Sequence, residues 1–200
     1  MAGKQTTELE AKEEGRSAAQ QDEIALVGRV ASGDAQAFEA LYRCFYPRLR
    51  RFLERMMRRP QLVEEILNDT MLVVWRKAHT YNLRSKVSTW IFAIAFRRAL
   101  KALSRVDDPV VFDAEEGTNP ANSGPEGELM AHQLRRLLSH AMTSLPAEQR
   151  AVIELTYYQG CAYREIAEIM GCPIDTVKTR MFHARRKLRA LLASRMEDVL

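Results

Sequence analysis

The sequence predicts an all-α protein built from two small helical domains that a flexible acidic linker joins. Apolar residues recur at the spacing of amphipathic helices in both parts of the chain, and no convincing stretch alternates as a strand would. Residues 106–128 lack helical periodicity and are rich in Asp, Glu, Pro, Gly and Asn. We therefore expect a disordered tail or frayed helix at 1–21, a first domain at 22–105, a linker at 106–127 and a second domain at 128–200.

The first domain should begin with two helices that Ser32-Gly33-Asp34 separates. Asp34 suits the N-cap of the second helix, because its carboxylate can accept hydrogen bonds from N–H groups of the first turn. Pro47 lies inside that helix and should kink it near Phe45, since proline has no N–H to donate. The apolar positions of these two helices are Ile24, Val27, Val30, Phe38, Leu41, Tyr42, Phe45, Leu49, Phe52, Leu53 and Met56.

Two more helices should complete the first domain, one from about Gln61 to His79 and one from about Val87 to Arg105. The stretch TYNLRSKVST between them interrupts the apolar pattern and therefore predicts a loop. The apolar positions are Leu62, Ile66, Leu67, Met71, Val74 and Trp75 in the first of these helices, and Trp90, Ile91, Ile94, Ala95, Leu100 and Leu103 in the second.

The second domain should contain four helices. The first covers residues 129–144, and Pro146 opens the next at its first turn, where a missing N–H costs nothing. A short helix then ends at Gly171, because glycine accepts the left-handed conformation that follows many helix C-termini. Pro173 cannot continue that helix but can enter the last one, which begins near Ile174.

The last two helices have the pattern of a helix-turn-helix, whose second helix can lie in the DNA major groove. Ala167 is small enough for two helices to cross closely, and Val177, Met181, Ala184 and Leu188 give the second helix one inward face. An ordinary helical hairpin with a basic face is the alternative. The candidates for base-edge contacts are Lys178, Thr179, Phe182 and His183, those for phosphate contacts are Arg180, Arg185 and Arg186, and Thr176 is a further DNA-binding candidate.

Charge is segregated along the chain, although the formal net charge is only +4. Residues 84–105 hold six basic residues and no acidic one, and residues 174–195 hold seven basic residues and one acidic. Residues 106–128 hold seven acidic residues and no basic one. A solvated face normally mixes both signs, so this segregation indicates a polyanionic partner, with a chance fluctuation as the alternative.

Several function classes are not supported. The odd cysteine number and the scattered histidines argue against a disulfide framework and a metal site, so we expect no metal and no cofactor. Motifs for phosphate loops or catalytic nucleophiles are missing, so we expect no enzyme. The N-terminus has no apolar core and no apolar run is long enough to span a membrane, which favours the cytoplasm and no membrane insertion.

One longer stretch gives a specific resemblance. The sequence SLPAEQRAVIELTYYQGCAYREIAEIMGCPIDTVKTRMFHARRKLRALL resembles region 4 of extracytoplasmic-function (ECF) RNA polymerase sigma factors. In the first domain FEALYRCFYPRLRRFL, VEEILNDTMLVVWRKA and STWIFAIAFRRALKAL resemble successive parts of region 2. The resemblance covers most of residues 22–195 and occurs in the family's order.

The resemblance implies a factor without chemistry of its own. Such a protein binds core RNA polymerase, through the clamp helices of the largest subunit and the flap of the second largest, recognises the −10 and −35 elements of promoter DNA and melts the first. It further implies that Glu65, Asn68 and Asp69 contact the polymerase, and that a flipped base binds in a pocket of the loop at 81–86. The residues it implies for the −10 element are Thr89, Trp90, Arg97, Arg98 and Lys101.

The chain departs from the family's usual pattern at five places. Arg97 stands where the family usually has Asn, Lys101 where it often has Asp, and Leu83 where Gly is common. Asp175 replaces a common Gly and His183 a common Arg. These departures leave the mechanism intact but put the promoter bases in doubt.

Two further expectations concern partners. An anti-sigma factor is a partner that the resemblance raises but does not identify. The rival function is a stand-alone helix-turn-helix repressor or activator. Such regulators usually dimerise, and the chain offers no obvious dimer helix.

Overall fold

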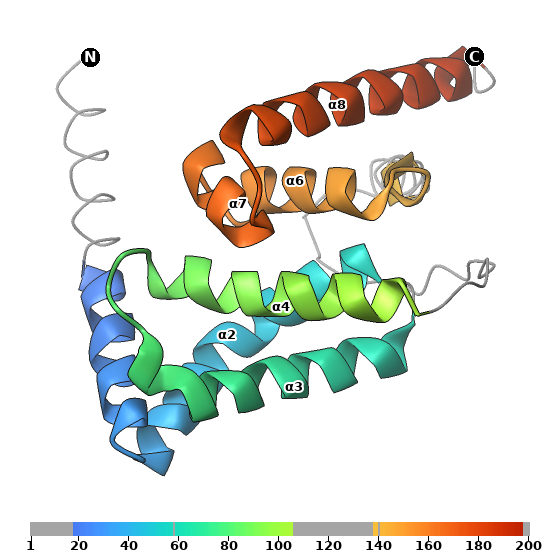
Figure 1. Cartoon of the computed structure of the whole chain (residues 1–200). Helices are drawn as coiled ribbons and strands as arrows, with labels where there is room; N and C mark the ends of the chain where they lie inside the picture. The colour runs from blue at the N-terminus through green and yellow to red at the C-terminus, as the bar shows by residue number, and fades with distance from the viewer. Residues whose placement is uncertain (1–17, 58, 106–137, 140, 198–200) are drawn as a thin grey trace, which may run out of the picture.

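The computed structural model describes residues 18–57, 59–105, 138–139 and 141–197, with side chains up to residue 193. Every regular element in these ranges is helical, which confirms the predicted fold class (Figure 1). The acidic linker expected at 106–127 and most of the helix expected at 129–144 lie outside the described residues.

The N-terminal half contains a helix at 18–31, α2 (Ala35–Met56), α3 (Pro60–Lys77), the short 3-10 helix η1 (Ala78–Thr80) and α4 (Val87–Leu103). Asp34 is the N-cap of α2, as predicted, and its Oδ1 accepts hydrogen bonds from the N–H groups of Gln36 at 2.9 Å and Ala37 at 3.0 Å. The helix expected from about Asp22 is already present at residue 18, the first residue that the structure describes. The helix at 61–79 instead ends as η1, because its last turn tightens.

The C-terminal half contains α6 (Ala147–Tyr157), α7 (Tyr163–Met170) and α8 (Ile174–Glu197). Gly171 has φ 62°, the left-handed conformation that the sequence predicted for the end of α7. Pro146 is the N-cap of α6 with extended backbone, one position before the first-turn place expected for it. With Gly171 in the left-handed conformation between α7 and α8, the turn has the backbone expected of a helix-turn-helix.

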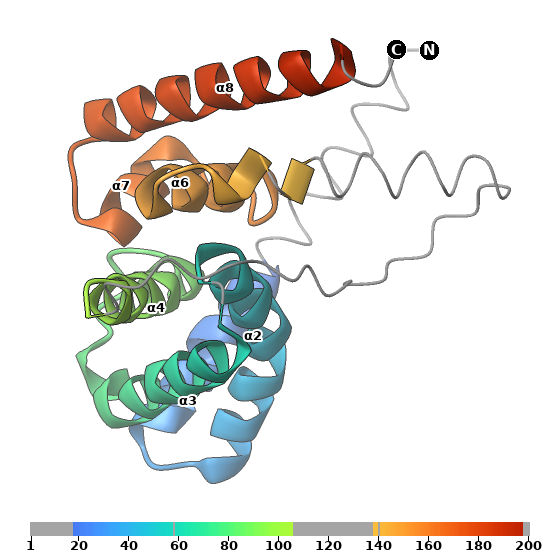
Figure 2. The same ribbon diagram turned by 90° about the vertical axis from the view of Figure 1, so that its right-hand side faces the viewer.

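Figures 1 and 2 show the helices stacked in layers, with α4 between the α2–α3 pair on one side and α6 and α7 on the other. Helix α8 lies beyond α6 and α7, on the outside of the stack. A helix between two layers is apolar on most of its surface, and α4 follows that rule apart from the exposed Arg97 and Lys101. Its buried residues are Val87, Thr89, Ile91, Phe92, Ala93, Ile94, Ala95, Phe96 and Ala99.

The two predicted domains also pack on each other, because one hydrophobic cluster contains residues of both halves. Phe45 and Ile91 of the N-terminal half belong to the same buried cluster as Val152 and Ile166 of the C-terminal half. Helix α4 joins the two halves in this cluster, since it packs on α7 as well as on α2 and α3.

Candidate nucleic-acid interface

The turn that begins α8 is fixed by backbone hydrogen bonds. The N–H of Cys172 donates to the carbonyl of Ala167 at 3.1 Å, and the N–H of Thr176 donates to the carbonyl of Pro173 at 3.0 Å. The inward face predicted for α8 is confirmed, since Val177, Met181 and Ala184 are buried and Leu188 packs against the core. The opposite face of α8 is consequently left to solvent.

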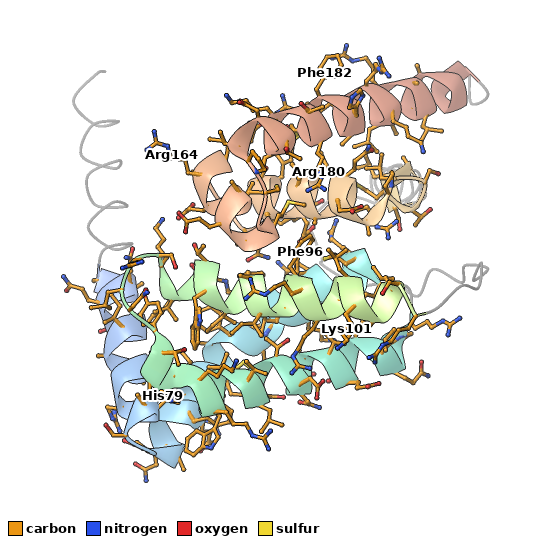
Figure 3. All side chains as sticks on the ribbon, in the orientation of Figure 1. His79, Phe96, Lys101, Arg164, Arg180 and Phe182 are labelled. Atoms are coloured by element: carbon orange, nitrogen blue, oxygen red, sulfur yellow. The ribbon has the colours of Figure 1, made fainter. Side chains whose placement is uncertain are left out.

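Most of the predicted DNA-binding residues lie on this outward face. Phe182 is 61% exposed, a large value for an aromatic ring, and it projects from the outer side of α8 (Figure 3). Arg180 instead lies on the inner side, half-buried, with its guanidinium 4.0 Å from Glu148 and 3.5 Å from the Sγ of Cys172. Thr176 is half-buried. The exposed candidates are Lys178, Thr179, Phe182, His183, Arg185 and Arg186.

Three of the outward cations contact neighbouring side chains. The Nζ of Lys178 lies 2.9 Å from the Oδ1 of Asp175, in an exposed pair within the first turns of α8. Arg185 donates a hydrogen bond to the hydroxyl of Tyr157, a residue of α6 that sequence reasoning did not select. Arg186 lies over the Phe182 ring at 5.8 Å. The face therefore combines cations with one exposed ring, a mixture suited to phosphates and base edges.

The loop that precedes α4 is closed by its own side chains. The hydroxyl of Tyr81 donates to the carbonyl of Ser85 at 2.6 Å, and the N–H of Arg84 donates to the Oδ1 of Asn82 at 3.2 Å. Leu83 has φ 62°, in the left-handed region where glycine is at ease. The departure noted in the sequence, Leu83 in place of a common Gly, thus falls on a position whose backbone favours Gly.

A hollow of about 290 Å³ opens between this loop, the first helix, the start of α4 and the edge of α7. Tyr81 lines the hollow, and the half-buried ring of Trp90 packs against the Tyr81 ring with centroids 5.4 Å apart. Thr89 lines the hollow yet is only 3% exposed. Glu165 and Glu168 of α7 line it from the other half of the chain. A hollow therefore lies beside the loop for which the resemblance implies a base pocket, and residues of α7 form part of its wall.

The remaining −10 candidates lie farther along α4. Arg97 and Lys101 are exposed, whereas Arg98 is half-buried and pairs through its guanidinium with the carboxylate of Asp69 on α3. The pair joins a residue predicted for the polymerase to one predicted for DNA. Sequence reasoning treated the two separately, because they lie on different helices.

The polymerase candidates share an exposed surface of α3. Glu65 and Asn68 are exposed, and the Oδ1 of Asn68 accepts a hydrogen bond from the hydroxyl of Tyr42 at 3.1 Å. Leu72, one turn after Asn68, is 43% exposed and was not selected from the sequence. Its helical spacing from Glu65 and Asn68 was the available signal, since an apolar residue on a polar face is unusual. We call Glu65, Asn68, Asp69 and Leu72 the α3 face.

The contacts between the halves include a buried carboxylate. Glu154 of α6 is 0% exposed, and its Oε2 lies 3.2 Å from the Nε of Arg55 on α2. Burial raises the pKa of Glu154 to about 7, against the opposing effect of Arg55 and Arg51. Arg150, also buried, donates to the carbonyl of Met56 at 2.9 Å and to that of Leu145 at 2.6 Å. The Arg55–Glu154 and Arg150–Met56 contacts join parts of the chain that are distant in sequence, so no local sequence pattern could have predicted them.

Two other kinds of site find no support over the ranges described above. No group of three or more His, Cys, Asp or Glu side chains comes together there in a way that could hold a metal ion. Within the same ranges, the helices are too polar or too short to cross a membrane.

Sequence models of two families match the chain. Residues 41–108 match "Sigma-70 region 2" and residues 135–188 match "Sigma-70, region 4". The ECF RNA polymerase sigma factor RpoE of Cereibacter sphaeroides is 33% identical over 157 residues, which covers 78% of this chain and 86% of the relative.

Two solved structures have a similar fold. CnrH, in complex with the cytosolic domain of CnrY, superposes with a TM-score of 0.64 at 22% identity and covers 86% of this chain and 98% of that one. The sigma factor RpoE of Bartonella quintana, in complex with the anti-sigma factor NepR, gives a TM-score of 0.59 at 23% identity, with 80% and 98% covered.

Proposed function

The chain belongs to the ECF sigma factors of the sigma-70 family and directs transcription by RNA polymerase, and from that premise we propose how its surfaces divide the work. Residues 22–105 serve as region 2 and residues 128–200 as region 4. The match of residues 41–108 to region 2 disfavours the rival, a stand-alone helix-turn-helix regulator, because that function has no use for the N-terminal half.

The observation that carries the proposal is the outward face of α8, which presents cations and Phe182 on the far side of the stack. This face enters the major groove of the −35 element. Lys178, Thr179 and His183 contact base edges, while Arg185 and Arg186 contact phosphates. Arg180 is a weaker candidate for a phosphate contact than the sequence indicated, because its side chain faces Glu148 of α6.

The −10 element is handled by the loop at 81–86 and α4. A base that leaves the stack enters the hollow beside Tyr81 and Trp90, where an aromatic ring can stack on it. Arg97 and Lys101, both exposed, neutralise phosphates of the same strand. The strained loop residue Leu83 lies at the rim of the hollow and contributes apolar surface there.

Core polymerase docks on the α3 face. Its clamp helices meet Glu65 and Asn68 directly, with Tyr42 fixing the side chain of Asn68. Leu72 supplies the apolar centre that a polar contact surface needs for affinity. Asp69 contributes less by direct contact, because Arg98 already occupies its carboxylate. Region 4 in turn meets the flap of the second-largest subunit.

Two expectations from the sequence stay with this proposal: the chain has no catalytic activity of its own, and it acts in the cytoplasm, where promoter DNA is found. We further propose that the partner raised by the resemblance, an anti-sigma factor, controls the chain. This proposal rests on a structural neighbour, since the Bartonella quintana sigma factor was solved with such a partner. A protein from the native cell that co-purifies with the parent chain but not with the surface variant Glu65→Lys would identify this factor.

Run-off transcription tests the proposal. Core polymerase with this chain should give discrete transcripts from genomic fragments, and core polymerase alone should not. Transcripts should disappear when either mapped element is scrambled. A chain that binds DNA but never alters transcription by core polymerase would leave only the rival regulator.

A core titration tests the α3 face separately. Glu65→Lys should weaken binding of labelled chain to core polymerase roughly tenfold, because it replaces an anion by a cation and so reverses the charge complementarity proposed with the clamp helices. Glu39→Lys is the matched control, since Glu39 is an exposed acid on α2 outside the α3 face. Equal binding by both variants would remove Glu65 from the interface.

A further inference from the structure

An exposed tyrosine of α6 contacts a cation on the outward face of α8. Tyr157, the last residue of α6, is 58% exposed, and its hydroxyl oxygen accepts a hydrogen bond from the Nη2 of Arg185 at 2.5 Å. The guanidinium carbon of Arg185 lies 5.7 Å from the centre of the Tyr157 ring. The two helices pack on each other (Figures 1 and 2), so this contact joins them at the surface and not in the core.

Packing does not explain the aromatic ring at this position. Val152 and Leu155, earlier in α6, belong to the buried cluster, whereas Tyr157 lies outside it. A ring with more than half of its surface in water gains little from the hydrophobic effect. The hydrogen bond and the ring contact described for Tyr157 are both with Arg185, which makes that arginine the residue through which the tyrosine acts.

The hydroxyl fixes Arg185 without cancelling its charge. Lys178, on the same helix, is paired with the carboxylate of Asp175 at 2.9 Å. Across the part of the chain that the structure describes, no carboxylate pairs with Arg185. A guanidinium has five N–H donors, so most of them stay available when one is used on Tyr157. Arg185 therefore keeps its charge and most of its donors for an anion.

Arg185 lies at the border of the surface that we assign to the −35 element. It comes two helical turns after Lys178, so both residues lie on one flank of α8, and it directly follows the buried Ala184. Phosphates border the groove that a recognition helix enters. A side chain on the flank reaches such a phosphate only in some of its rotamers, and a free arginine samples many.

We propose that Tyr157 is a positioning residue for the −35 element: its hydroxyl holds the guanidinium of Arg185 in the orientation that binds a DNA phosphate. The inference deepens the proposed function of α8 and rests on it. Tyr157 acts through Arg185 and not by touching DNA. Immobilising a long side chain on binding weakens affinity by roughly two- to tenfold, and a side chain that is already held avoids most of that loss.

The test removes the hydroxyl alone. Tyr157→Phe keeps the ring and deletes the acceptor, so the complex of chain and core polymerase should bind a duplex with the −35 element roughly fivefold more weakly. The probe carries the element that run-off transcription has mapped. Tyr158→Phe is the matched control, because Tyr158 is also exposed but its ring contacts Arg55 of α2. That control should bind as the parent chain does, and both variants should keep the helicity of the parent in circular dichroism.

The dependence on salt separates the position of Arg185 from its charge. Arg185→Ala deletes a phosphate contact, so it should lower the affinity and reduce the slope of log affinity against log salt by about one. Tyr157→Phe leaves the charge in place and should lower the affinity with the slope unchanged.

A double-mutant cycle shows whether Tyr157 acts through Arg185. In a chain that carries Arg185→Ala, the further change Tyr157→Phe should have no effect, because the hydroxyl then has no guanidinium to hold. A direct contact of Tyr157 with DNA would instead weaken binding by the same factor with and without Arg185.

The inference is overturned if Tyr157→Phe binds within about twofold of the parent, if it reduces the salt slope as Arg185→Ala does, or if its effect persists without Arg185. It is also overturned if Arg185→Ala binds as the parent does. A parent complex that binds matched and scrambled −35 duplexes alike is a different result, because it rejects the proposed function of α8 instead.

Discussion

The two proposed DNA-binding helices differ in how the fold presents them. Helix α8 has one apolar side, which packs inward, and its candidate residues point to solvent, with Phe182 61% exposed. Helix α4 is apolar nearly all round, and Thr89 at its start is 3% exposed. The difference teaches that the helix-turn-helix can be accessible to solvent while the surface that we assign to the −10 element is largely buried.

The cause is visible in the apolar pattern of each helix. A helix with a single stripe packs on one neighbour, whereas a helix that is apolar all round needs a layer on both sides. The second layer on α4 is α7, which brings Glu165 to the pocket. Burying α4 therefore places an acidic side chain at the pocket that we assign to the −10 element.

The largest expected effect breaks the contact between the halves. Arg150→Ala removes a buried guanidinium that donates to the carbonyls of Met56 and Leu145. Because charged hydrogen bonds are lost and buried carbonyls are left without them, the free energy of unfolding should fall by about 3–5 kcal/mol. Urea unfolding followed by circular dichroism measures it, and a loss under about 1 kcal/mol would contradict the role given to Arg150.

A change of pH should sharpen the comparison through the buried carboxyl of Glu154 on α6. The pKa of Glu154 in the folded chain, about 7, lies above its ordinary value of 4.5, so the folded chain binds more protons than the unfolded chain between these values. This contribution to stability is present at low pH and is lost as the pH rises through 7. Between pH 5.5 and 8 it should cost about 2 kcal/mol.

The control for that prediction is Glu154→Gln, which cannot titrate. Unfolding free energies of parent and variant at both pH values isolate the carboxyl from every other group. If the two chains show the same pH dependence, the burial of Glu154 does not govern stability in this window.

On α8 the comparison concerns two kinds of cation. Lys178→Ala should change which −35 sequences are preferred, with a loss of roughly 1–3 kcal/mol on the preferred element only. Arg186→Ala should lower affinity for all sequences alike and reduce the salt slope by about one. Titrations of the core complex on matched and scrambled elements at several salt concentrations distinguish them. If the two variants behave identically, the assignment of Lys178 to base edges and Arg186 to phosphates is wrong.

The smallest expected effect lies in the loop before α4. Leu83→Gly removes a side chain from a left-handed backbone position and should stabilise the chain by about 1 kcal/mol. It also removes apolar surface from the rim of the hollow, so DNA opening should slow even as stability rises. Thermal unfolding and permanganate reactivity of promoter thymines measure the two effects. Destabilisation would show that the Leu83 side chain has a packing role.

Local signals in the sequence were enough for much of the fold. Periodicity located the helices, Asp34 and Gly171 marked a start and an end, and the inward face of α8 was identified residue by residue. Each of these depends on neighbours within a turn or two of the chain. The α8 candidates came from the helix-turn-helix pattern, whereas the α3 candidates came from the family resemblance.

Long-range contacts were not predictable in this way. The pairing of Asp69 with Arg98, of Arg55 with Glu154 and of Lys86 with Glu165 joins residues on different helices. Nothing in a single sequence links such residues, because each alone looks like an ordinary surface charge. The apolar residues of α4 beyond one face, such as Phe92 and Phe96, were the one hint that a second layer covers it.

Binding of two DNA probes by the unmodified chain tests the central claim most directly. The free chain should bind a duplex with the −35 element in a salt-dependent way and bind a single strand with the −10 element at least tenfold more weakly than its complex with core polymerase does. If the free chain binds the single strand as tightly as the complex does, the −10 surface is not largely buried in the free chain and the account is wrong.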